Sequence, residues 1–248
     1  MSSFTLMVGC GGSGGWAARM LSKSRGNGAD VVLADGDKWE SGNLDRCLAG
    51  PLDVGAWKVR TAGRLLRSAG YGVAELPRYL APGTDDWRTL LDDGRAMRLL
   101  CFVDNHAARR TCLRLADLRA ERGAENDVVA IAGNEYESAS ADAYLPAWRG
   151  SPLDPRVRYP EIETDDSRDP LSPPCTGEAV ESAPQLAEAN GLSAFAALWL
   201  MRVWAEREPA RRGSEFYVQI ADRMPVSIQY GSVSAKVLTK KEVEDGRN

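Results

Sequence analysis

Several features that would direct a protein to a particular compartment or partner are missing from this chain of 248 residues. Its five cysteines are an odd number and no two form a CxxC pair, so neither a disulfide framework nor a four-cysteine zinc site is expected. The formal net charge is −4, and the chain therefore lacks the basic excess that binding to nucleic acid requires. No basic segment followed by an apolar one opens the chain, and we expect no signal peptide.

Long hydrophobic runs are missing as well. The most apolar segment, residues 192–205, is interrupted by Arg202 and is shorter than the roughly 20 residues that span a bilayer. We therefore predict a cytoplasmic protein without a membrane partner, whose cysteines stay reduced.

Short apolar segments alternate with helical patterns in the first 133 residues. Strands are predicted over residues 4–8, 30–34, 73–76, 98–103 and 128–132. Helices are predicted over residues 16–22, 57–69 and 107–122, with a short one around Leu90 and Leu91. This alternation is typical of an α/β fold, and we predict a Rossmann-like, doubly wound, mostly parallel sheet.

The pattern changes in the second half of the chain. We expect one more strand over residues 138–144, a long loop over 146–174, and a helix over 178–206 that is buried in the core or against a second subunit. Residues 215–221 and 226–230 are predicted to form a C-terminal antiparallel pair. We interpret residues 1–248 as a single domain, with a nucleotide-binding half (1–135) and a second half (136–248) that carries a crossover loop.

A glycine-rich turn joins the first predicted strand to the first helix. Gly9, Gly11, Gly12 and Gly14 leave room for the backbone to approach a phosphate, and the N-terminus of the next helix carries partial positive charge. Alone, the motif is also compatible with a purely structural turn or with an NAD site. The turn therefore predicts a bound nucleotide without identifying it.

Asp35 ends the second predicted strand, about 20 residues beyond the glycine turn. A carboxylate at this place accepts the ribose hydroxyls of a nucleotide, with a plain loop carboxylate as the alternative. Asn43, Arg46 and Lys58 follow in order. Two cations and an amide suit a triphosphate better than NAD, while each cation alone would be read as a solvated surface charge.

Asp104 follows the fourth predicted strand, at the sheet edge where open α/β folds place their ligands. A carboxylate that faces a triphosphate is best used as a Mg²⁺ ligand. The alternative is that Asp104 caps the following helix. His106, the single histidine of the chain, is interpreted as a residue of that helix's first turn.

These motifs occur in the order GCGGSGG, DGD, NLDR, VGAWK and VDNHAARR, over residues 4–135. In this order they resemble the ThiF/MoeB/ubiquitin-activating superfamily. The resemblance continues more weakly over residues 173–204, which are similar to the ThiF-type proteins of PRTRC gene systems. Enzymes of the superfamily adenylate the C-terminal glycine of a ubiquitin-like β-grasp protein.

The resemblance implies a role for each motif residue. Asp35 would hold the ribose, Asn43, Arg46 and Lys58 the phosphates of ATP, Asp104 the Mg²⁺, and Arg109 would support the site. It implies ATP and Mg²⁺, a β-grasp protein substrate, a homodimer or heterodimer, and a downstream conjugating protein. Many members carry CxxC zinc pairs, but this chain has none, so no zinc is expected. The chemistry needs no general base because the attacking carboxylate is already ionised, so the scarcity of histidine is no obstacle.

Cys175 follows the predicted loop, after two prolines, and is a candidate to accept the acyl group as a thioester, with a plain turn residue as the alternative. Cys10, Cys101 and Cys112 are expected in the core. The chain departs from the family pattern in having Cys47 after Arg46, where glutamine is common. It also lacks the N-terminal helix whose arginine reaches into a partner's site, so we expect the site to be completed by another residue or by a partner.

The sequence thus leads to one main hypothesis and two alternatives. The main hypothesis is ATP-dependent activation of a ubiquitin-like protein. An NAD-dependent oxidoreductase is the second, and it leaves Asn43, Arg46, Lys58 and Asp104 unexplained. The third is a non-catalytic nucleotide-binding subunit of a heterodimer, which would bind ATP without pyrophosphate exchange.

Overall fold

The computed structural model describes residues 2–24, 26–134, 138–166, 186–206, 215–219 and 227–231. Its strands are β1 (Ser3–Val8), β2 (Asp30–Ala34), β3 (Gly72–Leu76), β4 (Ala96–Cys101), β5 (Val128–Asn134), β6 (Ser138–Tyr144), β7 (Glu215–Gln219) and β8 (Ser227–Gly231). Its α-helices are α1 (Gly12–Leu21), α2 (Lys58–Ser68), α3 (Asp85–Asp92), α4 (His106–Ala120), α5 (Pro155–Arg158), α6 (Glu161–Thr164) and α7 (Ala187–Glu206). Three 3₁₀ turns are η1 (Ser41–Asn43), η2 (Pro51–Asp53) and η3 (Pro146–Trp148).

All the strands belong to one sheet with the order β3-β2-β1-β4-β5-β6-β7-β8. Strands β1 to β5 pair in parallel, whereas β6 pairs antiparallel with β5, β7 with β6, and β8 with β7. The predicted mostly parallel sheet with C-terminal antiparallel strands is therefore confirmed. Because β1 lies between β2 and β4, the strand order reverses beside it, and this is where such sheets bind ligands.

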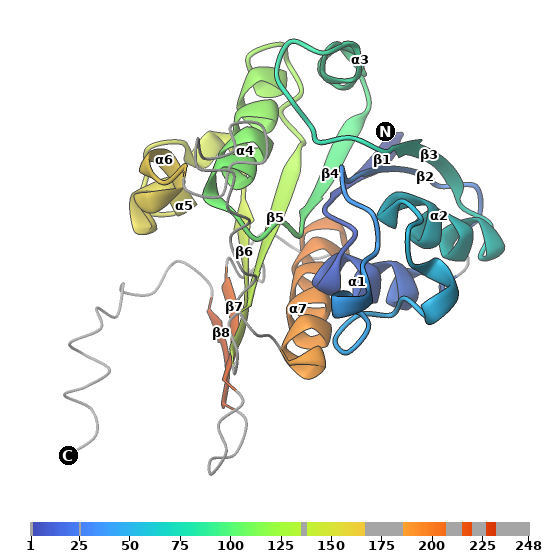
Figure 1. Ribbon diagram of the computed structural model, residues 1–248. Helices are drawn as coiled ribbons and strands as arrows, with labels where there is room; N and C mark the ends of the chain where they lie inside the picture. The colour runs from blue at the N-terminus through green and yellow to red at the C-terminus, as the bar shows by residue number, and fades with distance from the viewer. Residues whose placement is uncertain are drawn as a thin grey trace, which may run out of the picture.

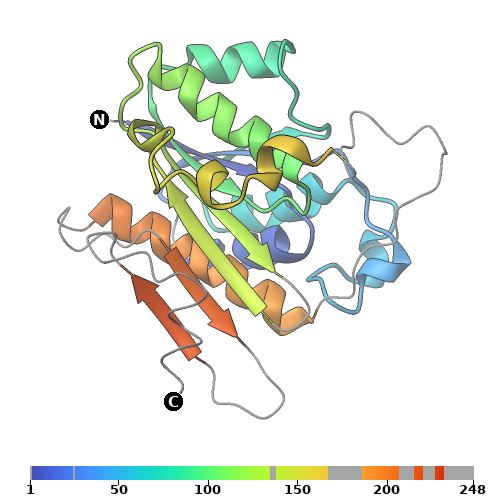
Figure 2. The same ribbon diagram turned by 90° about the vertical axis from the view of Figure 1, so that its left-hand side faces the viewer.

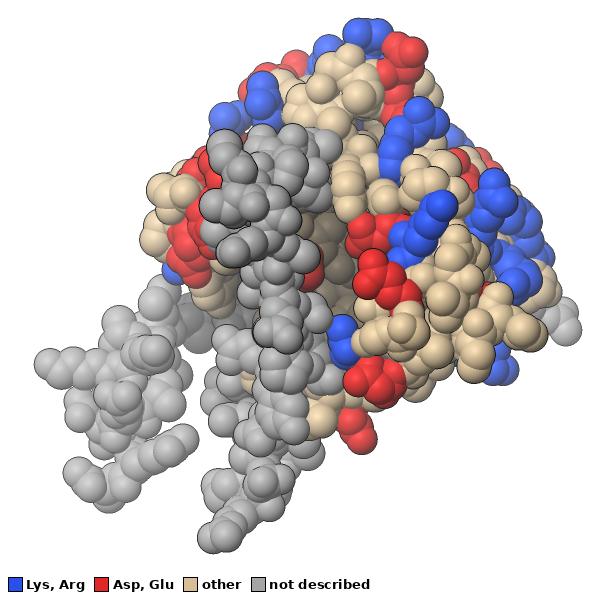
Figure 3. Space-filling model, in the orientation of Figure 1, with Lys and Arg blue, Asp and Glu red and all other residues tan. Residues whose placement is uncertain are grey.

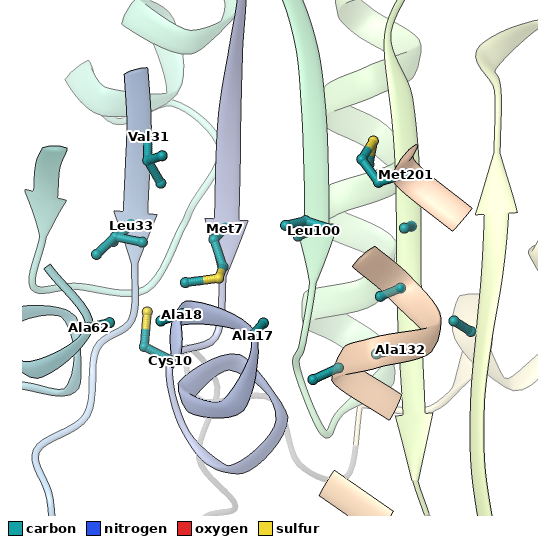
Figure 4. Close-up of a cluster of buried hydrophobic side chains, with 14 of the residues drawn as sticks. Met7, Cys10, Ala17, Ala18, Val31, Leu33, Ala62, Leu100, Ala132 and Met201 are labelled. Carbon is teal, nitrogen blue, oxygen red and sulfur yellow. The ribbon is translucent and has the colours of Figure 1, made fainter. Parts of the chain in front are cut away.

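Helices cover both faces of the sheet, with α1, α2 and α7 on one face and α3 and α4 on the other (Figures 1 and 2). Side chains along β1 alternate between the two faces of the sheet and so contribute to the core on each face. Phe4 and Leu6 pack toward α4, and Met7 packs toward α1. Figure 4 shows Met7 and Cys10 in the layer between the sheet and α1. Cys10, Cys101 and Cys112 are fully buried, as expected from the sequence.

Most predicted elements are present with shifted ends. Residues 30–34 and 138–144 form strands with the predicted bounds. Strand β4 ends at Cys101 rather than at residue 103, because Phe102 and Val103 leave the strand and line a cavity. Helix α1 begins at Gly12 rather than at Trp16, since close packing of Gly12 against Asn190 and of Gly14 against the Gly9 carbonyl outweighs the poor helix propensity of glycine.

The prediction of one long loop over residues 146–174 is wrong for its described part. Residues 146–166 include η3, α5 and α6. Asp154 caps α5 by accepting from the backbone N–H of Arg156, and Pro155 occupies the first helical position. The Arg156 guanidinium donates to Asp117 of α4 at 2.7 Å, which holds the short helices against α4. Proline and aspartate therefore start helices here instead of marking only a loop.

Helix α7 packs on the sheet of its own chain. Ala194, Ala197 and Leu200 are fully buried in the core layer that also contains Met7, so this face of α7 belongs to the core, whereas Phe195 on another face is 43% exposed. Of the predicted helix over residues 178–206, α7 covers 187–206, and residues 178–185 lie outside the described residues. Among the helices that the structure describes, none combines the length and apolar character needed to cross a bilayer.

Candidate functional site

A cavity of about 720 Å³ lies at the carboxyl ends of β1, β2 and β4. Figure 3 shows a hollow on this face bordered by both acidic and basic side chains. Eight residues that the sequence proposed separately line the cavity: Gly9, Gly11, Gly12, Asp35, Asn43, Arg46, Lys58 and Asp104. Residues spread over almost a hundred positions of the chain thus converge on one space at the reversal of the strand order.

The glycines of the turn are required for different physical reasons. Gly9 has a positive φ of 87°, and a Cβ there would lie 2.6 Å from the carbonyl oxygen of Phe102. A Cβ at Gly14 would lie 2.0 Å from the carbonyl oxygen of Gly9, so Gly14 shapes the turn and does not line the cavity. Gly11 precedes α1, whose N-terminus has no side-chain cap. The first backbone N–H groups of α1 are thus suited to bind an anion.

Asp35 is a buried carboxylate that faces the cavity. Its Oδ2 accepts from the backbone N–H of Cys10 at 2.6 Å, and its Oδ1 accepts from the backbone N–H of Asp37 at 2.8 Å. Burial raises the pKa of Asp35, while the charge of Lys58 and the two backbone donors oppose this rise. Each oxygen retains acceptor capacity, which suits the hydroxyl groups of a ribose.

Asp37 holds Lys58 in the cavity wall, and sequence reasoning did not assign it a role. The Lys58 Nζ donates to Asp37 Oδ2 at 2.8 Å, and the Tyr79 hydroxyl donates to Asp37 Oδ1. Burial favours a higher pKa for the Asp37 carboxyl, but these two hydrogen bonds outweigh it and leave the pKa lowered. Burial lowers the pKa of Lys58, but Asp35 and Asp37 raise it more, so Lys58 remains a fixed positive charge.

The DGD motif places a second acid, Asp37, two positions after Asp35, and this spacing is the sequence feature from which a role for Asp37 could have been predicted. No sequence pattern pointed to Tyr79. It lies after β3, and its ring packs over the backbone of Gly36, where a Cβ would lie 2.7 Å from the ring. The contact therefore depends on how the loops after β2 and β3 meet in space.

Asn43 and Arg46 lie in the loop between β2 and α2. The Asn43 side chain accepts from the backbone N–H of Glu40 at 3.1 Å, which stabilises η1. The Arg46 guanidinium donates to the carbonyl oxygen of Gly42 at 2.8 Å and forms an ion pair with Asp45 at 3.0 Å. Only 16% of the Arg46 side chain is exposed, so this cation belongs to the cavity wall rather than to the open surface.

Asp104 is an exposed carboxylate between β4 and α4, on the cavity lining. It is not the cap of α4: Asn105 Oδ1 accepts from the backbone N–H of Ala108 at 2.8 Å and caps the helix instead. Within the described ranges no group of three or more His, Cys, Asp or Glu side chains could hold a metal ion by itself. A metal bound by Asp104 would therefore take further ligands from phosphate oxygens or water, as Mg²⁺ commonly does.

Arg109 does not line this cavity. It faces a second cavity of about 400 Å³ that adjoins the first, because Ala132 and Asn134 line both. His106 also lines the second cavity, from the first turn of α4 as expected. His106 Nδ1 and Arg109 Nε are buried without a hydrogen-bond partner among the described residues. Burial and the charge of Arg109 both lower the pKa of His106.

Asn190 is a further residue on the lining of the main cavity that sequence reasoning missed. It comes from the first turn of α7, far along the chain from the other lining residues. Cys47, the residue that departs from the family pattern, also lines the cavity, and burial raises the pKa of its thiol. Cys175 lies outside the described residues, so its place relative to the cavity stays a prediction.

Comparison with known proteins adds a family and a fold. A family model described as the ThiF family matches residues 1–137. Among curated proteins no match is found.

Several solved structures share the fold. A structure of PaaA is 19% identical, with a TM-score of 0.60 over 93% of this chain and 64% of that one. A structure of E. coli MccB with ATP is 20% identical, with a TM-score of 0.61 over 92% and 63%. A structure of E. coli MccB with MccA is 20% identical, with a TM-score of 0.58 over 94% and 65%. This chain therefore spans less than two thirds of the length of each, and at such identities the likeness is one of fold.

Proposed function

The chain belongs to the ThiF family, and from this premise we propose that it is an ATP-dependent enzyme that adenylates a C-terminal carboxylate. The observation that carries the proposal is the convergence of the glycine turn, Asp35, Arg46, Lys58 and Asp104 on one cavity. The presence of ATP in a similar structure of MccB supports a nucleotide as the occupant. Binding of NAD, by comparison, would not explain why Arg46, Lys58 and Asp104 line the cavity.

In the proposed reaction, a carboxylate oxygen attacks the α-phosphorus of ATP. The bond from the α-phosphorus to the bridging oxygen breaks, pyrophosphate leaves, and an acyl-adenylate remains. Both reactants are anions, so the site has to align them and neutralise charge. Lys58, kept protonated by Asp35 and Asp37, and the half-buried loop cation Arg46 supply positive charge for the phosphates. No side chain has to remove a proton from the nucleophile.

Asp104 is the residue that we propose as the protein ligand of Mg²⁺. It is exposed on the cavity lining, and among the described residues its carboxylate has one hydrogen bond, a long one of 3.5 Å from Asn105 Nδ2. Its oxygens are therefore available to a cation. Bound Mg²⁺ would supply charge neutralisation on the phosphates.

The second cavity suits the acyl substrate. It joins the nucleotide cavity at Ala132 and Asn134 and places Arg109 beside this junction, with an Nε that has no hydrogen-bond partner in the described ranges. We propose that Arg109 binds the substrate end that carries the reacting carboxylate. The finer proposal for the substrate is a ubiquitin-like β-grasp protein ending in glycine. MccA in complex with MccB supports a peptide or protein in this role more generally.

ATP–pyrophosphate exchange tests the proposed function. Radiolabelled pyrophosphate, ATP and Mg²⁺ are supplied with the protein and either a β-grasp protein ending in glycine or short peptides with free carboxyl ends. Exchange that depends on one of these acyl substrates supports the proposal. Tight ATP binding with no exchange for any of them favours a non-catalytic nucleotide-binding subunit, and preferential binding of NAD favours an oxidoreductase.

Replacing Arg109 with glutamine is expected to weaken binding of the acyl substrate selectively. A charge-assisted hydrogen bond is worth about 1.5–3 kcal/mol, so the KM for the acyl substrate should rise about tenfold or more in the exchange assay. The Kd for ATP should change by less than about twofold, since Arg109 faces the second cavity. Arg122→Gln, at an exposed arginine just beyond α4, is the matched control. A rise in the Kd for ATP with an unchanged KM for the acyl substrate would show that Arg109 acts on the nucleotide and not on the acyl substrate.

Cys175 is proposed as the acceptor of the acyl group. In that step the thiolate attacks the acyl carbonyl carbon, AMP leaves, and a thioester forms. Cys175→Ala should spare pyrophosphate exchange but abolish a thiol-sensitive adduct between enzyme and substrate, measured by non-reducing electrophoresis and mass spectrometry. Cys47→Ala is the control for a second accessible thiol near the cavity. Persistence of the adduct in Cys175→Ala would show that another group accepts the acyl chain.

A further inference from the structure

The Asn190 side chain lies where three distant parts of the chain meet at the glycine turn. It is 1% exposed and belongs to the first turn of α7. Its Oδ1 accepts from Ser13 Oγ at 3.1 Å and from Asn134 Nδ2 at 2.9 Å. Its Nδ2 donates to the backbone carbonyl of Arg46 at 3.5 Å. One amide thus contacts α1, the end of β5 and the loop that carries Arg46.

The orientation of this amide follows from its partners. A backbone carbonyl can only accept, so the atom that faces Arg46 has to be the nitrogen, and the oxygen then faces Ser13 and Asn134. Both acceptor positions of Oδ1 are used in this arrangement. An amide nitrogen carries two N–H groups, and the hydrogen bond to Arg46 uses one. The second N–H has no hydrogen-bond partner among the described residues, and Asn190 lines the nucleotide cavity.

The contact with Gly12 places the amide at the phosphate end of the cavity. A Cβ at Gly12 would lie 2.6 Å from Asn190 Oδ1 and 2.9 Å from Nδ2, so the amide lies directly against the glycine turn. Asp35, the expected ribose ligand, is at the end of β2 instead. The neighbours of Asn190 are the turn and the loop of Arg46, both of which are expected to contact phosphates.

We propose that Asn190 is a nucleotide-binding residue whose free Nδ2–H donates to an oxygen of the β- or γ-phosphate. The inference rests on the proposed function and adds to it a phosphate ligand from the second half of the chain. A neutral donor at this position neutralises no charge, but it fixes the direction of the distal phosphates relative to Gly12 and Arg46. Because the leaving group of the reaction is pyrophosphate, Asn190 holds the part of ATP that departs.

Calorimetric titration with ATP, ADP and AMP tests the assignment. For Asn190→Asp, which has the same shape but loses the donor and adds negative charge, the Kd for ATP should rise about tenfold or more. The Kd for ADP should rise with it if the acceptor is on the β-phosphate, and should stay unchanged if the acceptor is on the γ-phosphate. The Kd for AMP, which lacks both distal phosphates, should change by less than about twofold. Asn190→Ala should give the same pattern with a smaller rise, and it provides the test if the charged variant does not fold.

Ser193→Ala is the matched control. Ser193 hydrogen-bonds Ser13 at 2.6 Å and the Asn190 carbonyl at 3.0 Å, but it does not line the cavity, so the Kd for ATP should stay within about twofold of the unaltered protein. Equal weakening of ATP, ADP and AMP in the Asn190 variants would overturn the assignment and leave Asn190 a merely structural residue, as would an unchanged Kd for ATP. If the unaltered protein binds none of the three nucleotides, the proposed function itself fails.

Discussion

Asp104→Asn is expected to abolish ATP–pyrophosphate exchange, with a loss of at least about a thousandfold, because the charge stabilisation that a metal supplies is worth several kcal/mol. The other aspartates on the cavity lining are already engaged: Asp35 accepts two backbone N–H groups, and Asp37 accepts from Lys58 and Tyr79. Asp104 is exposed on the cavity lining and, within the described part of the chain, accepts only the long hydrogen bond from Asn105. Among the aspartates of the lining, it is therefore the one whose oxygens are available to a Mg²⁺ shared with phosphate.

Asparagine keeps the size and the oxygen of the side chain but removes its charge, so this substitution tests charge rather than packing. The measurement is pyrophosphate exchange at a series of Mg²⁺ concentrations, alongside thermal unfolding. Asp92→Asn is the control, because that aspartate lies at the end of α3, its side chain is 70% exposed, and its pairing with Arg122 is a surface ion pair of small energetic value. Full exchange activity in Asp104→Asn would remove Asp104 from the mechanism.

Arg119→Met is expected to lower the free energy of unfolding by about 3–5 kcal/mol, which is the usual cost of removing one partner of a buried ion pair. Arg119 and Asp127 are both fully buried, and the guanidinium Nε donates to Asp127 Oδ2 at 2.6 Å. The same guanidinium donates to backbone carbonyls of Leu90, Asp93 and Arg95. Methionine fills a similar volume but leaves the Asp127 carboxylate buried without its cation.

Denaturant unfolding followed by circular dichroism measures this loss. Adding Asp127→Asn to Arg119→Met should recover part of the stability, because asparagine can still accept from the backbone N–H of Met97 but carries no charge. Arg122→Met, at a side chain that is 52% exposed, should change stability by less than about 1 kcal/mol. A loss of similar size in Arg122→Met and Arg119→Met would mean that burial of the pair contributes little.

The helix that contains Arg119 illustrates what a local pattern can and cannot predict. The sequence indicated a charged amphipathic helix over residues 107–122, and α4 lies there at His106–Ala120. The pattern did not reveal that Arg119 and Asp117 are buried, since charged residues at helical spacing usually face solvent. Their burial depends on partners from other elements: Asp127 precedes β5, and Arg156 belongs to α5.

The sequence by itself determined the alternation of strands and helices, the glycine turn, and the set Asp35, Asn43, Arg46, Lys58 and Asp104 that was expected around it. These predictions succeed because apolar periodicity and glycine spacing act over a few residues, and parallel strands bring their carboxyl ends to one edge. Only the tertiary structure decided that Arg109 faces a second cavity, that Tyr79 holds Asp37, and that Asn190 lies against Gly12. Contacts such as that between Ser13 and Asn190, 177 positions apart, depend on how α7 packs against α1, and no local pattern encodes that packing.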